Sequence, residues 1–156
     1  MELWQRIDTG PLEEARALLT AACGSRRWVD GMLMRRPFGS REALLAVARD
    51  EWFSLDESDW REAFSHHPKI GEKTADRLAS KEQSGVSGAA ADVLAALVEG
   101  NRDYEKKFGY IFIVCATGKR ADEMLALLAK RLPNDPATEI RIAAEEQARI
   151  TALRLT

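Results

Sequence analysis

This 156-residue sequence has few cysteines, no excess of positive charge and no long apolar run. Its two cysteines, Cys23 and Cys115, lie far apart and outside any CxxC pair, so the sequence has no disulfide framework and favours a reducing compartment. No stretch approaches the roughly 18 apolar residues of a membrane-spanning helix, and the N-terminal MELWQRIDTG lacks the apolar core of a signal peptide. We therefore expect a cytoplasmic protein with no membrane partner.

The charge balance disfavours another class of partner, the nucleic acids. Lysine and arginine number 23 against 25 aspartate and glutamate, and the net charge of −2 argues against a nucleic-acid partner. The composition, 46% hydrophobic and 31% charged, is that of an ordinary globular domain. A chain of this length buries enough surface to fold without disulfides or a structural metal, so we expect a single domain over residues 1–156.

Hydrophobic residues repeat with helical spacing along most of the chain. This pattern predicts an all-α fold, a single-domain helical bundle of about seven to nine helices. The predicted helices lie within 11–23, 25–38, 41–55, 59–67, 73–83, 88–108, 119–132 and 136–155. Capping signals support five of the starts: Asp8-Thr9-Gly10-Pro11 before the first helix, Ser40, Asp56 and Ser87 before three others, and Asp135-Pro136 before the last.

Residues 110–116, YIFIVCA, depart from this pattern. The segment is rich in β-branched and aromatic residues without alternation, which is typical of a buried strand, yet the sequence contains no convincing partner strand. An isolated strand is not stable in water. We therefore expect a buried connection, extended in part, whose backbone amides need hydrogen-bond partners.

His66 and His67, followed by Pro68, are the only histidines in the chain, and they stand at a predicted helix end. Histidine is the side chain best suited to proton exchange near neutral pH, and a helix end next to a polar loop is a common place for function. The alternative is a surface pair that acts as a helix C-terminal charge, and the spacing alone favours that alternative.

A metal site is a further alternative at this place. His66, His67, Glu72 and Asp76 supply suitable ligand atoms. Adjacent side chains on a helix diverge, however, and the sequence has no HExxH, CxxC or EF-hand pattern. The pattern therefore disfavours a metal.

Two other features carry polar groups that suit a small polar ligand. The run 80–84, SKEQS, contains a carboxylate, a carboxamide and two hydroxyls, although a solvated helix face would look the same. Arg154 lies between Leu153 and Leu155 near the end of an amphipathic helix, and its planar guanidinium suits a carboxylate or a ring carbonyl. The alternative is an arginine that simply reaches solvent.

Taken in order, these pieces resemble one family. His67-Pro68, Glu82-Gln83, the segment FGYIFIVCA over 108–116, and a last helix with Gln147, Ile150 and LRL resemble 2-oxo-4-hydroxy-4-carboxy-5-ureidoimidazoline (OHCU) decarboxylases over nearly the whole chain. The resemblance implies an all-helical homodimer that needs no cofactor and no metal. It implies conversion of the small molecule OHCU to (S)-allantoin in urate degradation, after urate oxidase and hydroxyisourate hydrolase.

The resemblance also implies a set of site residues. His67 is the expected catalytic acid and base, with Glu82 and Arg154 beside it. The expected substrate-binding residues are Pro68, Ala79, Ser80, Lys81, Glu82, Gln83, Phe112, Ile113, Val114, Cys115 and Ala116. One departure stands out, because the family pattern Ser-x-x-Glu-Gln has Ala79 at the serine position here, with Ser80 one residue later.

Two other functions compete with this one. A non-enzymatic helical interaction module would leave His67, the polar run and Arg154 as unrelated surface features, and it would expose residues 110–116 to solvent. A metal-dependent lyase would lose activity with a chelator. Trp28, Trp52 and Trp60 either line a dimer interface or fill the core.

Overall fold

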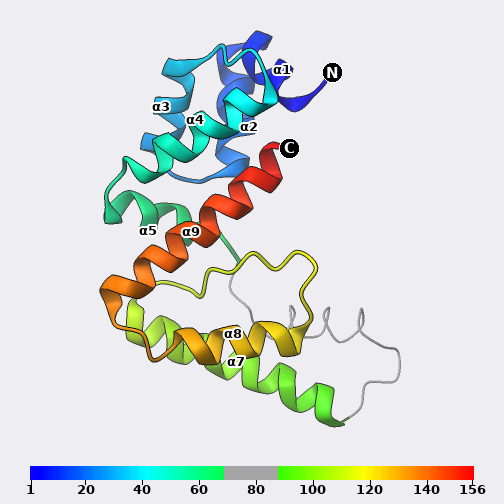
Figure 1. Cartoon of the computed structure of the whole chain (residues 1–156), viewed down its shortest axis with the longest axis vertical. Helices are drawn as coiled ribbons and strands as arrows, with labels where there is room; N and C mark the ends of the chain where they lie inside the picture. The colour runs from blue at the N-terminus through cyan, green and yellow to red at the C-terminus, as the bar shows by residue number, and fades with distance from the viewer. Residues whose placement is uncertain (69–87) are drawn as a thin grey trace. The chain divides into compact units, whose positions relative to one another are not determined.

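The computed structural model describes residues 1–68 and 88–156, and it is helical (Figure 1). Within these ranges there are eight helices and no strand, which confirms the predicted all-α fold. The helices are α1 (Leu3–Thr9), α2 (Leu12–Ala22), α3 (Arg26–Arg35), α4 (Arg41–Phe53), α5 (Glu57–Ser65), α7 (Gly88–Phe108), α8 (Ala121–Arg131) and α9 (Pro136–Leu155). The helix predicted over 73–83 and the cap predicted at Ser87 lie outside the described residues.

Three of the predicted caps form as expected. The side chains of Ser40, Asp56 and Asp135 accept hydrogen bonds from the backbone amides of Ala43, Asp59 and Thr138, at 3.0, 3.1 and 3.0 Å. Each satisfies an amide in the first helical turn that has no partner within its helix. These starts depend on neighbours in sequence, so sequence alone could predict them.

The helix expected from residue 11 forms as α2, which begins at Leu12 with Pro11 at its N-cap. The helix before it, α1 (Leu3–Thr9), was not predicted. Asp8 does not cap α2, because its carboxylate accepts hydrogen bonds from the amides of Phe38 and Gly39, both at 2.8 Å. Asp8 thus fixes a distant turn, and its role could not be found from local spacing.

The contacts divide the chain into two compact units. One comprises Met1–His67 with Ala144–Thr156, and the other comprises Pro68–Ala143. The single domain over residues 1–156 therefore stays a prediction. None of the helices in the described parts of the chain is long and apolar enough to cross a bilayer.

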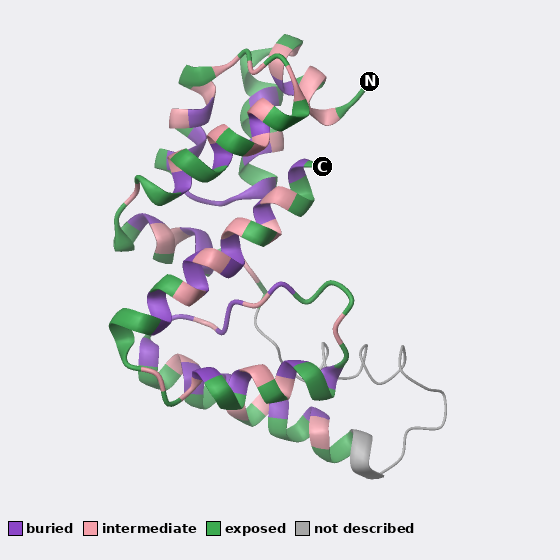
Figure 2. Cartoon of the chain, viewed as in Figure 1, coloured by how far each residue is buried: buried purple, intermediate pink, exposed green. Residues whose placement is uncertain are grey.

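Tryptophans fill the core of the first unit, where α3 packs against α2, α4 and α5. Buried stretches alternate with exposed ones along these helices (Figure 2). Trp28 and Trp52 are 0% and 2% exposed, and Trp60 is half-buried. Each indole Nε1–H donates to a backbone carbonyl, and Trp52 reaches Ala144 of α9 at 2.9 Å. Trp28 and Trp52 are therefore core residues, and Trp52 holds the last helix against α4.

In the second unit α7 and α8 lie side by side (Figure 1). Their approach is close at Gly100, where an added Cβ would come within 2.6 Å of Leu128 Cδ2. α7 ends at Phe108, and the next residue, Gly109, has a φ of 84° that favours glycine. The chain then enters the 110–116 segment.

Residues 111–116 form neither helix nor strand, as expected of a buried connection. Phe112 and Ile113 are 5% and 2% exposed, and burial of such side chains stabilises a fold by roughly 1.5–3 kcal/mol each. Arg131 Nη1 donates to the Ile113 carbonyl at 2.6 Å, and the guanidinium lies 4.5 Å from the centre of the Phe112 ring. A side chain of α8 thus takes the place of a partner strand.

Candidate functional site

The two histidines follow α5 and have different environments. His66 is exposed and lies against Gly24, where an added Cβ would overlap the imidazole. His67 is half-buried, and its amide donates to the Phe64 carbonyl at 3.2 Å. The simple surface pair considered from the sequence is therefore wrong for His67.

The imidazole of His67 is held by the last helix. Its Nε2 lies 2.5 Å from Oε1 of Gln147, a residue of α9 that is 0% exposed. Gln147 Nε2 in turn donates to Thr151 Oγ1 at 3.0 Å. Thr151 is 5% exposed, and its hydroxyl lies 3.4 Å from the carbonyl oxygen of Ala22. A chain of buried hydrogen bonds thus runs from His67 to the end of α2.

Arg154 lies near the same carbonyl. Its Nη1 donates to the carbonyls of Ala21 and Ala22, at 3.4 and 3.5 Å. Positions 147, 151 and 154 are four and three residues apart, a spacing that places side chains on one face of a helix. One face of α9 therefore serves both His67 and Arg154.

The environment of His67 favours its neutral form. Burial lowers the pKa of His67 below its ordinary value, and the positive charges of Arg154 and His66 lower it further. The hydrogen bond to Gln147 opposes this shift. The neutral imidazole can accept a proton, while the nearby guanidinium can bind an anion.

The other predicted residues fall into three groups. Pro68 is exposed directly after His67. Phe112, Ile113 and Cys115 are buried in the second unit, where Val114 is half-buried and Ala116 is exposed. Ala79, Ser80, Lys81, Glu82 and Gln83 lie outside the described residues. The structure thus brings His67 and Arg154 to one face of α9, and the place of Glu82 stays a prediction.

Two residues of this arrangement had no role in the sequence-based prediction. Gln147 entered only as part of the family resemblance, and Thr151 was not singled out. Both are polar residues on the buried side of α9, and this polarity indicates a hydrogen-bonded role, because buried amides and hydroxyls require partners. The partner of Gln147 lies 80 positions away in sequence, so local pattern alone does not identify it.

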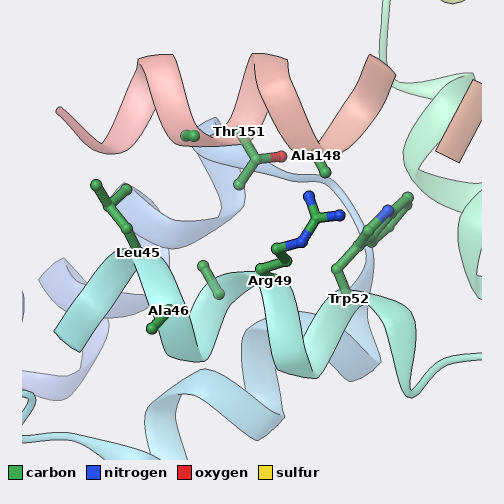
Figure 3. Close-up of a pocket in the computed structure, with 8 residues that line it drawn as sticks. Leu45, Ala46, Arg49, Trp52, Ala148 and Thr151 are labelled. Atoms are coloured by element: carbon green, nitrogen blue, oxygen red, sulfur yellow. The ribbon is translucent and has the colours of Figure 1, made fainter. Parts of the chain in front are cut away.

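A cavity of about 300 Å³ lies between α4 and α9 (Figure 3). Its lining includes Leu45, Ala46, Arg49, Trp52, Ala148 and Thr151, but neither His67 nor Arg154. Arg49 is paired with Glu145 of α9 at 2.9 Å. The cavity is mostly apolar, so it offers few groups for a charged, polar substrate.

Metal and thiol chemistry find little support among the described residues. No group of three or more histidine, cysteine, aspartate or glutamate side chains in residues 1–68 and 88–156 could hold a metal ion. Glu72 and Asp76, named as candidate ligands, lie outside these ranges. Burial raises the pKa of the Cys23 thiol to about 11, so this thiol is protonated at neutral pH and is a poor nucleophile.

The sequence is similar to those of several known proteins. Over 142 residues the chain is 42% identical to the uric acid degradation bifunctional protein TTL of Arabidopsis thaliana, a match that covers 85% of this chain and 44% of that protein. It is 32% identical over 127 residues to the OHCU decarboxylase of Amia calva, covering 77% of this chain and 73% of that one. The chain thus spans less than half the length of the Arabidopsis protein.

Solved structures share the fold. A crystal structure of OHCU decarboxylase in the presence of (S)-allantoin matches with a TM-score of 0.75 and 37% identity, over 94% of this chain and 96% of that one. An (S)-allantoin synthase matches with a TM-score of 0.76, over 99% of this chain and 53% of that one, and at 17% identity it supports the fold alone. The sequence model of the OHCU decarboxylase family matches residues 9–156. With Arg154 on its last helix and His67 bound to Gln147 of the same helix, the chain belongs to the OHCU decarboxylase family.

Proposed function

We propose that this chain decarboxylates OHCU to (S)-allantoin in urate degradation, without a cofactor. The observation that carries the proposal is the arrangement around α9 in a member of this family: a half-buried histidine on Gln147 and a guanidinium on the neighbouring Ala22 carbonyl. One group can exchange a proton and the other can neutralise negative charge.

The reaction makes modest demands on a protein. Loss of carbon dioxide from a saturated carbon leaves an electron pair, and the neighbouring ring atoms of OHCU can accept it as an enolate-like anion. The protein must hold the carboxylate, stabilise the developing charge and deliver one proton to one face. General acid–base assistance typically contributes ~10²–10⁴-fold, and one aimed hydrogen-bond donor contributes about 10²–10³-fold. Side chains alone can therefore supply the catalysis.

We assign roles to the residues accordingly. His67 exchanges a proton with the substrate hydroxyl or with the new carbanion. Arg154 binds anionic oxygen, because a guanidinium has five N–H donors and Nη1 alone makes the bonds to Ala21 and Ala22. Glu82 orients His67 or the ureido group.

The remaining predicted residues bind the substrate in this proposal. The amides of Phe112–Ala116 donate to the ring, and Pro68 with residues 79–83 completes the contacts. The Ile113 carbonyl is already bonded to Arg131, so this segment offers amides rather than that carbonyl.

The proposal extends to the organisation of the protein. We propose one domain over residues 1–156 that works as a cytoplasmic homodimer, without a nucleic-acid or membrane partner. The family match over residues 9–156 supports one domain. Burial of Phe112, Ile113 and Cys115 counts against the competing interaction module, which would expose this segment.

Circular dichroism tests the function directly. OHCU is generated in situ from urate with urate oxidase and hydroxyisourate hydrolase, and the wild-type chain and His67→Ala are compared with and without a chelator. We expect fast, chelator-insensitive formation of (S)-allantoin that depends on His67. Decay at the spontaneous rate to racemic allantoin would reject the proposal in favour of the interaction module, and inhibition by the chelator would indicate a metal-dependent lyase.

A further inference from the structure

The hydrogen-bond chain that ends on His67 has a direction. It begins at the carbonyl oxygen of Ala22, which can only accept hydrogen bonds. The hydroxyl of Thr151 has one proton, and donation to Ala22 uses it. Thr151 Oγ1 therefore accepts from Gln147, at 3.0 Å, and the NH₂ group of Gln147 faces Thr151.

This direction determines which nitrogen of His67 carries hydrogen. With its NH₂ group on Thr151, Gln147 turns its amide oxygen to His67 Nε2 at 2.5 Å. An amide oxygen has no proton to give, so Nε2 must donate. The neutral imidazole then has its hydrogen on Nε2 and its lone pair on Nδ1.

We propose that Gln147 is a positioning residue that holds neutral His67 as the Nε2–H tautomer, so that Nδ1 is the atom that exchanges a proton with the substrate. The final step rests on the proposed function, whereas the tautomer is a property of the protein by itself. The same anchor serves both protonation states, because an imidazolium also donates from Nε2. His67 can therefore take up and return a proton at Nδ1 without turning its ring.

Burial makes the anchor selective. Gln147 is 0% exposed, so water cannot compensate for a rotated amide, whose oxygen would take the Thr151 proton away from the Ala22 carbonyl. Arg154 Nη1 lies 3.5 Å from the same Ala22 oxygen that receives the Thr151 hydroxyl. The Ala22 carbonyl thus orients the anchor of His67 and also contacts the proposed anion-binding group.

Nitrogen-15 NMR of the imidazole rings tests the tautomer without substrate. The full chain has only two histidines, so the imidazole signals that remain in the His66→Gln variant belong to His67. Above the pKa of His67, we expect its neutral ring to carry hydrogen on Nε2, with a proton protected from solvent exchange. A wild-type ring that carries hydrogen mainly on Nδ1 would overturn the proposal.

Two substitutions at Gln147 test the positioning role. Gln147→Met removes the acceptor at similar length, and we expect loss of the protected signal, a detectable Nδ1–H form and a fall in kcat on the order of 10- to 100-fold with little change in KM. Gln147→Glu restores an acceptor oxygen, so the Nε2–H form and most of the activity should return. Its carboxylate should raise the pKa of His67 and move the acid limb of the rate profile to higher pH. Gln5→Met on α1 is the matched control and should leave the His67 signals unchanged.

A further variant keeps the test decisive if Gln147→Met does not fold. Thr151→Val removes the hydroxyl that orients the amide and should also produce the Nδ1–H form, while Thr151→Ser should restore the wild-type tautomer. Full kcat in a folded Gln147→Met chain, or an unchanged tautomer in it, would overturn the role of Gln147. A wild-type chain with the Nε2–H ring but no OHCU turnover would overturn only the proposed function.

Discussion

At the scale of single residues, His67 and Arg154 are tied to the same carbonyl of α2. His67 reaches it through Gln147 and Thr151, and Arg154 reaches it directly. Two groups that share one support keep their relative placement during turnover. Small changes in either side chain should therefore affect the chemistry more than the fold.

Arg154→Lys tests the need for a guanidinium. Lysine keeps the positive charge but replaces the planar donor set with a single ammonium group, so we expect kcat/KM to fall on the order of 10- to 100-fold. The measurement is the initial rate of (S)-allantoin formation by circular dichroism. Arg149→Lys is the matched control on the same helix, since Arg149 is exposed and is paired with Glu146 at 2.9 Å. Equal rates for the two variants would contradict the assigned role of Arg154.

The lowered pKa of His67 predicts a pH dependence of activity. If neutral His67 accepts the proton, kcat/KM should fall only below the ordinary histidine pKa of about 6.5, because burial and the charges of Arg154 and His66 keep the ring neutral. The measurement is kcat/KM from pH 5 to 8, with Gln147→Glu as the comparison. An acid limb above the ordinary histidine range would contradict this prediction.

The same shift affects stability. Between the lowered pKa of the folded state and the ordinary pKa of the unfolded state, the unfolded chain binds more protons at His67. The free energy of unfolding should therefore decrease as the pH falls below about 6.5, and His67→Gln should lose part of this decrease. Urea unfolding at several pH values measures it, and identical pH profiles for the two chains would reject it.

At the scale of structural elements, the 110–116 segment is held by a buried polar cluster. Arg131 and Glu139 have side chains that are 7% and 0% exposed, and their charged groups lie 2.6 Å apart. Tyr104 also donates to Glu139, and burial raises the pKa of Tyr104, so this hydroxyl stays protonated. The cluster joins α7, α8 and α9 within the second unit and reaches the Ile113 carbonyl.

Arg131→Met should therefore be strongly destabilising. It leaves the buried carboxylate of Glu139 without its cation and removes a donor from Ile113, and removal of one partner of a buried pair costs about 3–5 kcal/mol. Adding Glu139→Gln should recover part of this loss, because the unpaired charge is then absent. Urea unfolding of both variants measures the effect. A loss no larger than that of Arg61→Met, on the exposed face of α5, would refute it.

Local sequence was sufficient for most helices but not for α1. Ser40, Asp56 and Asp135 act on amides three residues away, so their caps can be predicted from spacing. α1 has one buried residue, Ile7, and is held by Arg36, whose Nη1 donates to the carbonyls of Ile7 and Gly10 at 2.9 and 3.0 Å. Arg36 lies at the C-terminal end of α3, so the contacts that hold α1 produce no hydrophobic periodicity within α1 itself.

At the scale of the whole molecule, α9 belongs to both compact units. Residues 136–143 are part of one and residues 144–155 part of the other. Unfolding of either unit therefore removes packing partners from one end of this helix. We expect the chain to unfold cooperatively, as a single domain would.

The aromatic residues report on the two units separately. All four tryptophans, Trp4, Trp28, Trp52 and Trp60, lie in the first unit, and both tyrosines, Tyr104 and Tyr110, lie in the second. Tryptophan fluorescence and tyrosine absorbance should therefore give the same urea midpoint at one protein concentration. Two separate midpoints would contradict the single domain predicted from the sequence.

The sequence by itself determined the all-α class, most of the helices and the family, because these depend on periodicity, caps and motifs that neighbouring residues encode. It also singled out His67 and Arg154 as candidates. Only the tertiary structure decided that His66 is exposed while His67 is bound to Gln147, and that Thr151 and Arg154 meet at Ala22. These contacts join residues 80 or more positions apart, and a buried hydrogen bond exists only after packing has excluded water from both partners.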